Sequence, residues 1–144
     1  MLRAFDPVPT VSRTTPSATR LPTRSGATRR APELRFRIRI SDGEVIAVGP
    51  GKIALLEALD KTGSITAAAK RLDMSYRRAW LLLDELNRSL RQPAVASAKG
   101  GAAGGGSVLT DAGRDLVTLY RTIESKATVA CRTDIRKLMS MLAR

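Results

Sequence analysis

Residues 63–90 read GSITAAAKRLDMSYRRAWLLLDELNRSL, and this stretch decides the fold. Two serines stand where helices can begin, because the hydroxyl of Ser64 or Ser75 can accept from the backbone amides that open a helix. Between them, apolar residues recur at the i, i+3, i+4 and i+7 spacing of a helix with one buried face. These residues are Ile65, Ala68, Ala69 and Leu72. The pattern predicts a short helix, a turn at 73–75, and a second helix packed closely against the first.

A further helix is predicted immediately before this pair, over residues 52–62. It carries Ile53, Leu56 and either Leu55 or Leu59 on one side. Gly63 follows, and glycine is suited to the left-handed conformation that ends many helices. Three helices in close succession are therefore expected.

The helix expected over about 76–91 has two different faces. Its buried stripe is Ala79, Leu83, Leu86 and Leu90, with Tyr76 and Trp80 at the margins. We expect Trp80, beside the buried stripe, to be part of the core rather than a platform on which a base stacks. The opposite face collects Arg77, Leu81, Asp84 and Arg88, with Arg78 to one side. Arginine can bind guanine O6 and N7 with two hydrogen bonds, and an exposed leucine can meet a thymine methyl, so this face has the chemistry to read base pairs.

A glycine-rich hairpin follows Pro93. The expected strands are 94–98 and 107–109, joined by Lys99 and the segment 100–106, which reads GGAAGGG. The loop lacks the Gly-Lys-Ser/Thr sequence of a nucleotide-binding loop, so we interpret it as a contact to the DNA backbone through Lys99. Three helices followed by such a hairpin form a winged helix-turn-helix, which inserts its third helix into the major groove.

A long final helix is predicted after Thr110, whose hydroxyl can cap it, with Asp111 placed favourably for the helix dipole. Apolar residues continue along it to Ala130 and, after a shift of register, into Ile135, Leu138 and Leu142. This stripe exceeds what one small domain can cover, which favours a homodimer with two reading helices about 34 Å apart. The expected dimerisation residues are Leu116, Leu119, Tyr120, Ile123 and Ala127. The alternative is a helix folded back on its own domain near Cys131 and Arg132.

The N-terminal part divides into a tail and a hairpin. Residues 34–40 alternate between apolar and basic side chains, which is the period of a half-buried strand, and 44–48 predict a second strand after the turn residues 41–43. Residues 1–32 contain six arginines and one aspartate, a net charge of +5, without an apolar period. We expect a disordered basic tail there, either passive or adding sequence-independent DNA affinity, and a folded domain over 33–144.

The composition limits the classes of binding partner that are expected and argues against an enzyme. The 144 residues include 25 Lys and Arg against 13 Asp and Glu, a formal charge of +12. Such a charge suits DNA, although RNA, ribosomes or anionic lipid would also fit. With no histidine and the single Cys131, most metal sites and nucleophile sets cannot be assembled, so we expect no enzyme, metal or cofactor. No apolar stretch approaches the roughly 20 residues that cross a bilayer, and we expect a cytoplasmic protein.

Over about residues 34–128 the chain resembles the N-terminal DNA-binding domain of the ModE family of molybdate-responsive transcriptional regulators. The resemblance rests on Gly63-Ser64-Ile65 with Ala67, Ala68 and Ala69, on Ser75-Tyr76-Arg77-Arg78-Ala79-Trp80, on Glu85-Leu86-Asn87, on the glycine-rich wing, and on Val108-Leu109-Thr110 with Gly113. The last element alone is shared with LysR-type regulators. The resemblance implies sequence-specific repression or activation by a dimer on a pseudo-palindromic operator in double-stranded DNA.

The helix faces and the resemblance together give the expected DNA-contacting residues. They are Ser64, Thr66, Ser75, Tyr76, Arg77, Arg78, Leu81, Arg88 and Lys99. Full-length members of the family carry C-terminal oxyanion-binding modules of the Mop type, and no segment of that length follows Ala130. We therefore expect a stand-alone DNA-binding version without direct molybdate sensing. The signal that controls its DNA binding stays open: it is an unidentified effector, a partner protein or the protein's own concentration, or the protein responds to no ligand.

Other functions also remain open at this point. An architectural or nucleoid-type protein would bind phosphates with low sequence specificity and would use the basic tail as much as the third helix. A protein-interaction module would present the same surface to another protein. A small molybdate-binding protein is raised by the analogy alone.

Overall fold

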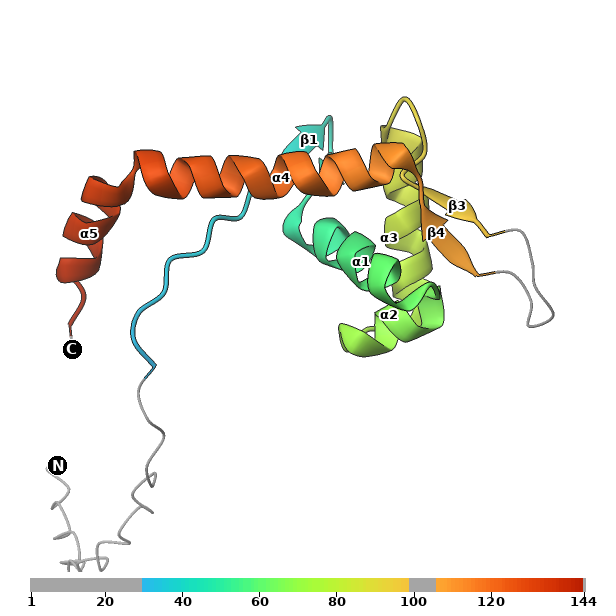
Figure 1. The fold of residues 1–144 in the computed structure, drawn as a ribbon, viewed down its shortest axis with the longest axis horizontal. Coiled ribbons are helices and arrows are strands. Elements are labelled where there is room, and N and C mark those ends of the chain that lie inside the picture. Colours follow the sequence, from blue (N-terminus) through green and yellow to red (C-terminus); the bar gives the residue numbers. More distant parts are fainter. Residues whose placement is uncertain (1–29, 99–105, 144) are drawn as a thin grey trace, which may run out of the picture. The chain divides into compact units, whose positions relative to one another are not determined.

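Two short hairpins and a series of helices make up the part of the chain that the computed structural model describes, residues 30–98 and 106–143. In chain order the elements are β1 (Ile40–Asp42), β2 (Val45–Val48), α1 (Pro50–Thr62), α2 (Ile65–Arg71), α3 (Tyr76–Ser89), β3 (Val95–Ser97), β4 (Ser107–Leu109), α4 (Asp111–Ala130) and α5 (Arg132–Ser140) (Figure 1). In these ranges β1 pairs with β2 and β3 pairs with β4, both antiparallel. The predicted class is confirmed: mainly α with a small amount of β, in the order of a winged helix-turn-helix.

Two predicted features lie outside the described residues. They are the tail up to residue 29 and the tip of the wing, residues 99–105. None of the helices in the described ranges is both long and apolar enough to cross a bilayer.

The N-terminal hairpin is shorter than predicted. The strand expected over 34–40 is wrong except at Ile40, because residues 34–39 pair with no strand in the described part of the chain. The alternation arises from different packing: Ile38 is half-buried against the core, while its backbone N–H donates to the Tyr120 hydroxyl at 3.2 Å. The same hydroxyl donates to the Ile38 carbonyl oxygen at 3.0 Å. A side chain of α4 thus takes the place of a neighbouring strand.

Helix α1 begins two residues earlier than predicted. The pair Pro50 and Gly51 is typical of turns, but here Pro50 occupies the first helical turn, where its fixed φ suits a helix and no N–H is needed. The predicted boundary at Lys52 is therefore wrong. The other end is as expected, since Gly63 has a φ of 67° and its N–H donates to the Leu59 carbonyl at 2.8 Å.

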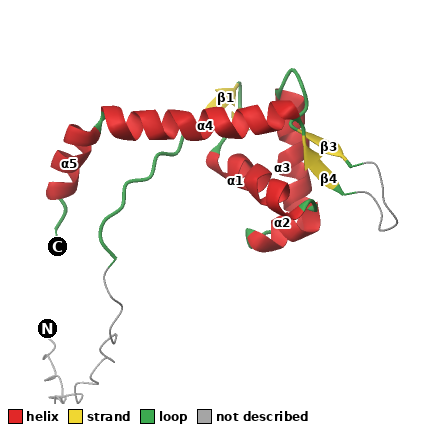
Figure 2. Ribbon diagram, in the orientation of Figure 1, coloured by secondary structure: helices red, strands yellow, loops and turns green. Residues whose placement is uncertain are grey.

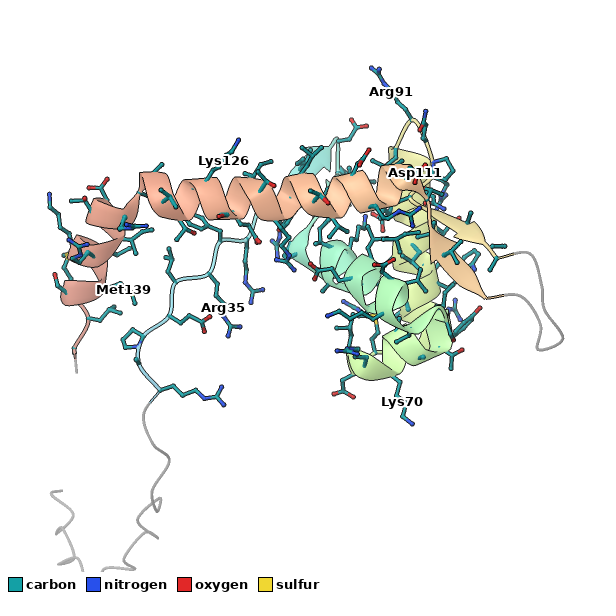
Figure 3. All side chains as sticks on the ribbon, in the orientation of Figure 1. Arg35, Lys70, Arg91, Asp111, Lys126 and Met139 are labelled. Carbon is teal, nitrogen blue, oxygen red and sulfur yellow. The ribbon has the colours of Figure 1, made fainter. Side chains whose placement is uncertain are left out.

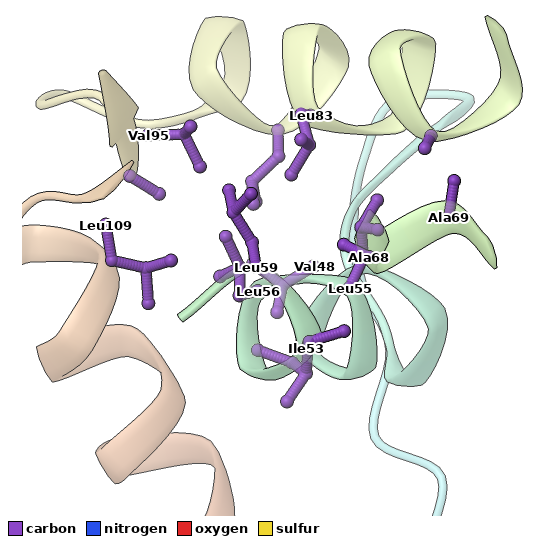
Figure 4. Close-up of a cluster of buried hydrophobic side chains, with 14 of the residues drawn as sticks. Val48, Ile53, Leu55, Leu56, Leu59, Ala68, Ala69, Leu83, Val95 and Leu109 are labelled. Atoms are coloured by element: carbon purple, nitrogen blue, oxygen red, sulfur yellow. The ribbon is translucent and has the colours of Figure 1, made fainter. Parts of the chain in front are cut away.

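The hydrophobic core forms around α1 (Figure 4). Four of its side chains, Ile53, Leu55, Leu56 and Leu59, have no exposed surface, so both residues weighed for the last core position are buried. Burial of one such side chain stabilises a fold by about 1.5–3 kcal/mol. The other elements contribute Val48, Ala68, Ala69, Ala79, Leu83, Leu86, Ala94, Val95, Leu109 and Tyr120. The helix-turn-helix, the wing and α4 therefore share one core.

A buried lysine joins the N-terminal hairpin to the third helix. The Lys52 ammonium donates to the backbone carbonyls of Ile46 and Ala47 and lies 3.3 Å from a Glu85 carboxylate oxygen. The two carbonyls belong to the β2 segment and Glu85 belongs to α3. This one side chain therefore fixes both elements at the N-terminal end of α1.

The C-terminal region is two helices rather than one. Thr110 caps α4 as predicted, since its Oγ1 accepts from the Gly113 N–H at 3.1 Å. The register shift expected in the apolar stripe after Ala130 is a break between two helices: Cys131 has a ψ of 12°, and α5 starts at Arg132. None of the described α5 side chains is buried.

Ion pairs link α4 to α1. The Arg121 guanidinium donates to both carboxylate oxygens of Glu57 at 2.7 Å and to Glu124 at 2.7 Å. This contact lowers the pKa of Glu57 below its ordinary value and raises the pKa of Arg121. A carboxylate with a lowered pKa stabilises the fold above its unfolded-state pKa of about 4.3, and this stabilisation disappears as the pH falls through the folded-state value.

We therefore expect Glu57→Gln to lower the free energy of unfolding by up to about 1 kcal/mol at pH 7, the range for a partly exposed ion pair. The difference from the wild type should shrink as the pH falls below about 4. Urea denaturation at a series of pH values measures it. Glu44→Gln is the control, because Glu44 is exposed and has no ion-pair partner in the described part of the chain. A difference that is independent of pH would contradict the role of the carboxylate charge.

Candidate nucleic-acid interface

Serine side chains cap the N-termini of α2 and α3. The Ser64 hydroxyl accepts from the Ala67 N–H at 3.3 Å, and the Ser75 hydroxyl accepts from the Arg78 N–H at 3.1 Å. Between the helices, Asp73 adopts a left-handed conformation with a φ of 54°. Both serine hydroxyls were predicted as DNA contacts, and the structure places them in helix capping. Ser64 therefore fixes the start of α2 after the turn from α1, and Ser75 fixes the start of α3 after the turn from α2.

Helix α3 separates its core face from its outward face as predicted. Ala79, Leu83 and Leu86 are buried, while Leu90 is half-buried at the residue that ends the helix. The predicted reading residues are all exposed: Tyr76, Arg77, Arg78, Leu81 and Arg88. The outward face is therefore free for a partner over the full length of the helix.

The expected burial of Trp80 is wrong. The residue was predicted as core, yet 47% of its surface is exposed. Adjacent residues in a helix point 100° apart, so Trp80 cannot share the direction of the fully buried Ala79. The small residues of α2 and α3 close the core without it, and the indole stands at the edge of the outward face.

The charged side chains of α3 are not equivalent. Arg88 forms an ion pair with Asp84 at 2.7 Å, one turn away. Neither Arg77 nor Arg78 has a carboxylate oxygen within 4 Å in the described part of the chain. These two guanidinium groups near the N-terminal end of α3 keep their donors available for phosphates or bases.

A shallow depression of about 470 Å³ adjoins the N-terminal end of α3. Thr66 and Lys70 of α2 line it together with Ser75 and Tyr76. Figure 3 shows the Lys70 side chain extending away from α2. The predicted contacts Thr66 and Tyr76 are thus brought together, with a lysine that the sequence reading did not single out.

Asn87 attaches the wing to α3, a positioning role that the sequence did not predict. The Asn87 Oδ1 accepts from the N–H groups of Ala94 and Val95 at 2.9 and 3.1 Å, and its Nδ2 donates to the Val95 carbonyl at 2.9 Å. A polar residue at the margin of an otherwise apolar stripe was the available signal. These bonds hold the start of β3 against the helix (Figure 2).

The second strand of the wing is fixed as well. The registers Val95 to Leu109 and Ser97 to Ser107 confirm the predicted hairpin. The Ser107 N–H donates to the Gly63 carbonyl at 3.2 Å, which ties the wing to the turn between α1 and α2. The expected wing contact Lys99 lies outside the described residues.

The residues predicted for dimerisation fall into two groups. Tyr120 is buried in the core of its own domain, so its side chain presents no surface to a partner, whereas Leu116 is half-buried and packs partly against the same core. The prediction is corrected for Tyr120, because the apolar stripe of α4 is wider than the part that faces the domain. Leu119 and Ile123 are 62% and 51% exposed, and Ala127 is half-buried. The exposed apolar surface continues through Val129, Leu138, Met141 and Leu142.

Comparison with known proteins agrees with this geometry. The family model described as bacterial regulatory helix-turn-helix protein, lysR family, matches residues 51–114. That range contains α1, α2, α3, the wing and the start of α4. The match therefore covers the elements that surround the outward face of α3.

The chain is also similar to curated proteins, over part of the length of each. The chain is 46% identical over 78 residues to the molybdenum-pterin-binding protein MopB of Rhodobacter capsulatus, which is 54% of this chain and 29% of that protein. It is 44% identical over 92 residues to the molybdenum transport protein ModE of Azotobacter vinelandii, and 39% over 98 residues to the DNA-binding transcriptional dual regulator ModE of Escherichia coli K12. These matches cover 62% and 65% of this chain, and 34% and 37% of those proteins. The chain thus spans about a third of the length of these relatives. Residues 51–114 thus match a LysR-type helix-turn-helix domain, and the similarity to these relatives supports a helix-turn-helix domain of the ModE type.

Proposed function

We propose that the chain is a sequence-specific regulator of transcription that binds double-stranded DNA through α3. The observation that carries this proposal is the outward face of α3, where Arg77 and Leu81 are exposed and Arg77 has no ion-pair partner in the described ranges. A capped turn fixes the helix at one end and Asn87 fixes the wing beside it. Such a rigid helix can enter the major groove while the wing meets the flanking backbone.

A dimer joined through α4 and α5 is part of this proposal. Leu119 and Ile123 are separated by one helical turn and expose apolar surface that the domain leaves uncovered. A second copy of the chain would bury this surface and place two α3 helices on a pseudo-palindromic operator. Substitution of Ile123 by glutamate should then shift the protein to the monomer in analytical ultracentrifugation, with little change in the fold.

Replacement of Arg77 tests the reading role. Arg77→Ala is expected to cost about 1–3 kcal/mol in binding to a duplex enriched by selection from random DNA, and to relax the preference at particular base pairs. Fluorescence anisotropy with the enriched duplex and a scrambled one measures both effects. Arg136→Ala on α5 removes the same charge elsewhere and should leave the preference unchanged. Equal losses on both duplexes would show that Arg77 contacts phosphates rather than bases.

An architectural role is the second candidate, favoured by the formal charge of +12 and the net charge of +5 in residues 1–32. Deletion of residues 1–32 separates the two functions. A regulator keeps its choice of site without these residues and loses mainly salt-dependent affinity, whereas an architectural protein loses most of its binding.

Molybdenum appears in the names of the relatives and describes those proteins alone. The similarity covers about a third of their length and coincides here with the DNA-binding elements. The proposed function is accordingly limited to DNA binding and regulation, and it assigns no molybdate site to this chain.

A further inference from the structure

Trp80 is a large side chain that the core does not use. It is the only tryptophan of the chain, and it is about half exposed although Ala79 beside it is fully buried. An indole combines a broad apolar ring with a single N–H donor, so it is usually found where one side is covered and the donor has an acceptor. In the described ranges the indole N–H has no hydrogen-bond acceptor.

The indole stands in a cleft of about 210 Å³ between α3 and the wing. Asp84 and Asn87 continue the wall formed by Trp80 on α3, and the strands of the wing supply the opposite wall. The wing residues are Val95, Ala96, Ser97 and Ser107. Because Asn87 holds β3 against α3, the two walls keep a fixed separation.

The charges around the cleft allow an anionic occupant. Asp84 is the acidic residue in the lining, and Arg88 neutralises it through an ion pair at 2.7 Å. The hydroxyls of Ser97 and Ser107 lie on the side of the wing and can donate to an oxygen acceptor. The cleft therefore combines an apolar surface with neutral hydrogen-bond donors.

We propose that this cleft takes the sugar-phosphate backbone of one DNA strand, with the Trp80 ring against a deoxyribose and its N–H donating to a phosphate oxygen. The inference rests on the proposed function. On the surface of α3, Trp80 lies about 60° from Arg77, towards the wing. A duplex whose bases meet Arg77 thus brings the adjoining backbone to Trp80. Contacts of this kind position a protein on DNA and carry no sequence information themselves.

Trp80 is the single tryptophan in these 144 residues, so its fluorescence provides a direct spectroscopic test. Titration with duplex DNA should change the intensity and emission maximum of Trp80 until one protomer is bound per half-site. The change should occur with an enriched duplex and with a scrambled one, because the backbone is common to both.

Affinities of variants provide the second readout. Trp80→Ala is expected to weaken binding to the enriched and the scrambled duplex by the same factor of about ten, the order of one aromatic stacking contact. Trp80→Phe keeps an apolar ring without the donor and should lose about threefold. The dependence of affinity on salt should not change, since the indole is uncharged. Ile40→Ala removes a comparably exposed apolar side chain from β1 and should leave both affinities unaltered.

The outcomes distinguish the inference from the proposed function. If the protein binds no duplex, both are overturned. If it binds duplexes with unchanged Trp80 fluorescence and Trp80→Ala retains full affinity, only the inference is overturned. A loss confined to particular base pairs would overturn the assignment to the backbone and identify a base contact instead. Urea denaturation of each variant confirms that it is folded, so that a lost affinity is not a lost structure.

Discussion

Replacing Gly113 with alanine is expected to lower the free energy of unfolding by about 3 kcal/mol, the upper part of the range for overpacking a core. A Cβ atom on Gly113 would overlap the Ala94 carbonyl oxygen and lie 3.0 Å from the carbonyl carbon. These are backbone atoms of a fully buried residue, so they cannot move aside as the end of a side chain can. The same carbonyl accepts from the Thr110 N–H at 3.0 Å, and displacing it would loosen α4 from the wing.

Gly51→Ala is the matched control. A Cβ at Gly51 in α1 would meet no atom within 4 Å, so this substitution should stabilise the protein by a few tenths of a kcal/mol, or up to about 1 kcal/mol, through its helix propensity. Urea denaturation followed by circular dichroism measures both variants. Similar effects of the two substitutions would show that close approach to Ala94 is not the reason for a glycine at 113.

Asn87→Ala is expected to be comparably severe, with a loss of about 3 kcal/mol. It removes three hydrogen bonds and leaves the N–H groups of Ala94 and Val95 and the Val95 carbonyl without their partner. Each unpaired buried polar group costs about 1–3 kcal/mol, and access of water to the loosened strand offsets part of this. Because the wing is no longer held against α3, affinity for DNA should also fall.

Two further variants separate these causes. Asn87→Asp keeps the acceptor for both N–H groups but loses the donor to Val95, so its stability should lie between those of the wild type and Asn87→Ala. Ser89→Ala, on the same helix, removes only the bond to the Glu85 carbonyl and should cost less than about 0.5 kcal/mol. A stable Asn87→Ala variant with unchanged DNA affinity would be incompatible with a positioning role for Asn87.

The helix-turn-helix was predictable because its signals are local. The hydroxyls of Ser64 and Ser75 cap the helices that they precede, and Gly63 takes the left-handed conformation. The helical period of α3 is also sufficient to predict that its arginines point outward, because this prediction requires nothing from the rest of the fold. For this part of the chain, local propensity and tertiary packing agree.

The errors arose where packing between distant segments decides the conformation. Alternation over 34–40 predicts a strand, but the partner of Ile38 is the hydroxyl of Tyr120, 82 positions away. The apolar stripe of α4 could not show which part of it faces its own domain, so Tyr120 was assigned to a dimer interface. Lys52 and Asn87 both bond to backbone groups, and a sequence pattern does not identify such partners.

Whether α3 reads base pairs as part of a dimer is measured by the sequences of the duplexes that the protein enriches from a random DNA library. A salt concentration of about 150 mM suppresses part of the binding that rests on phosphates alone. This role of α3 predicts an inverted repeat whose half-sites are centred about 10–10.5 base pairs apart, or a multiple of that spacing, with preferences that Arg77→Ala relaxes. Measurable binding without an enriched motif would contradict it and favour an architectural protein.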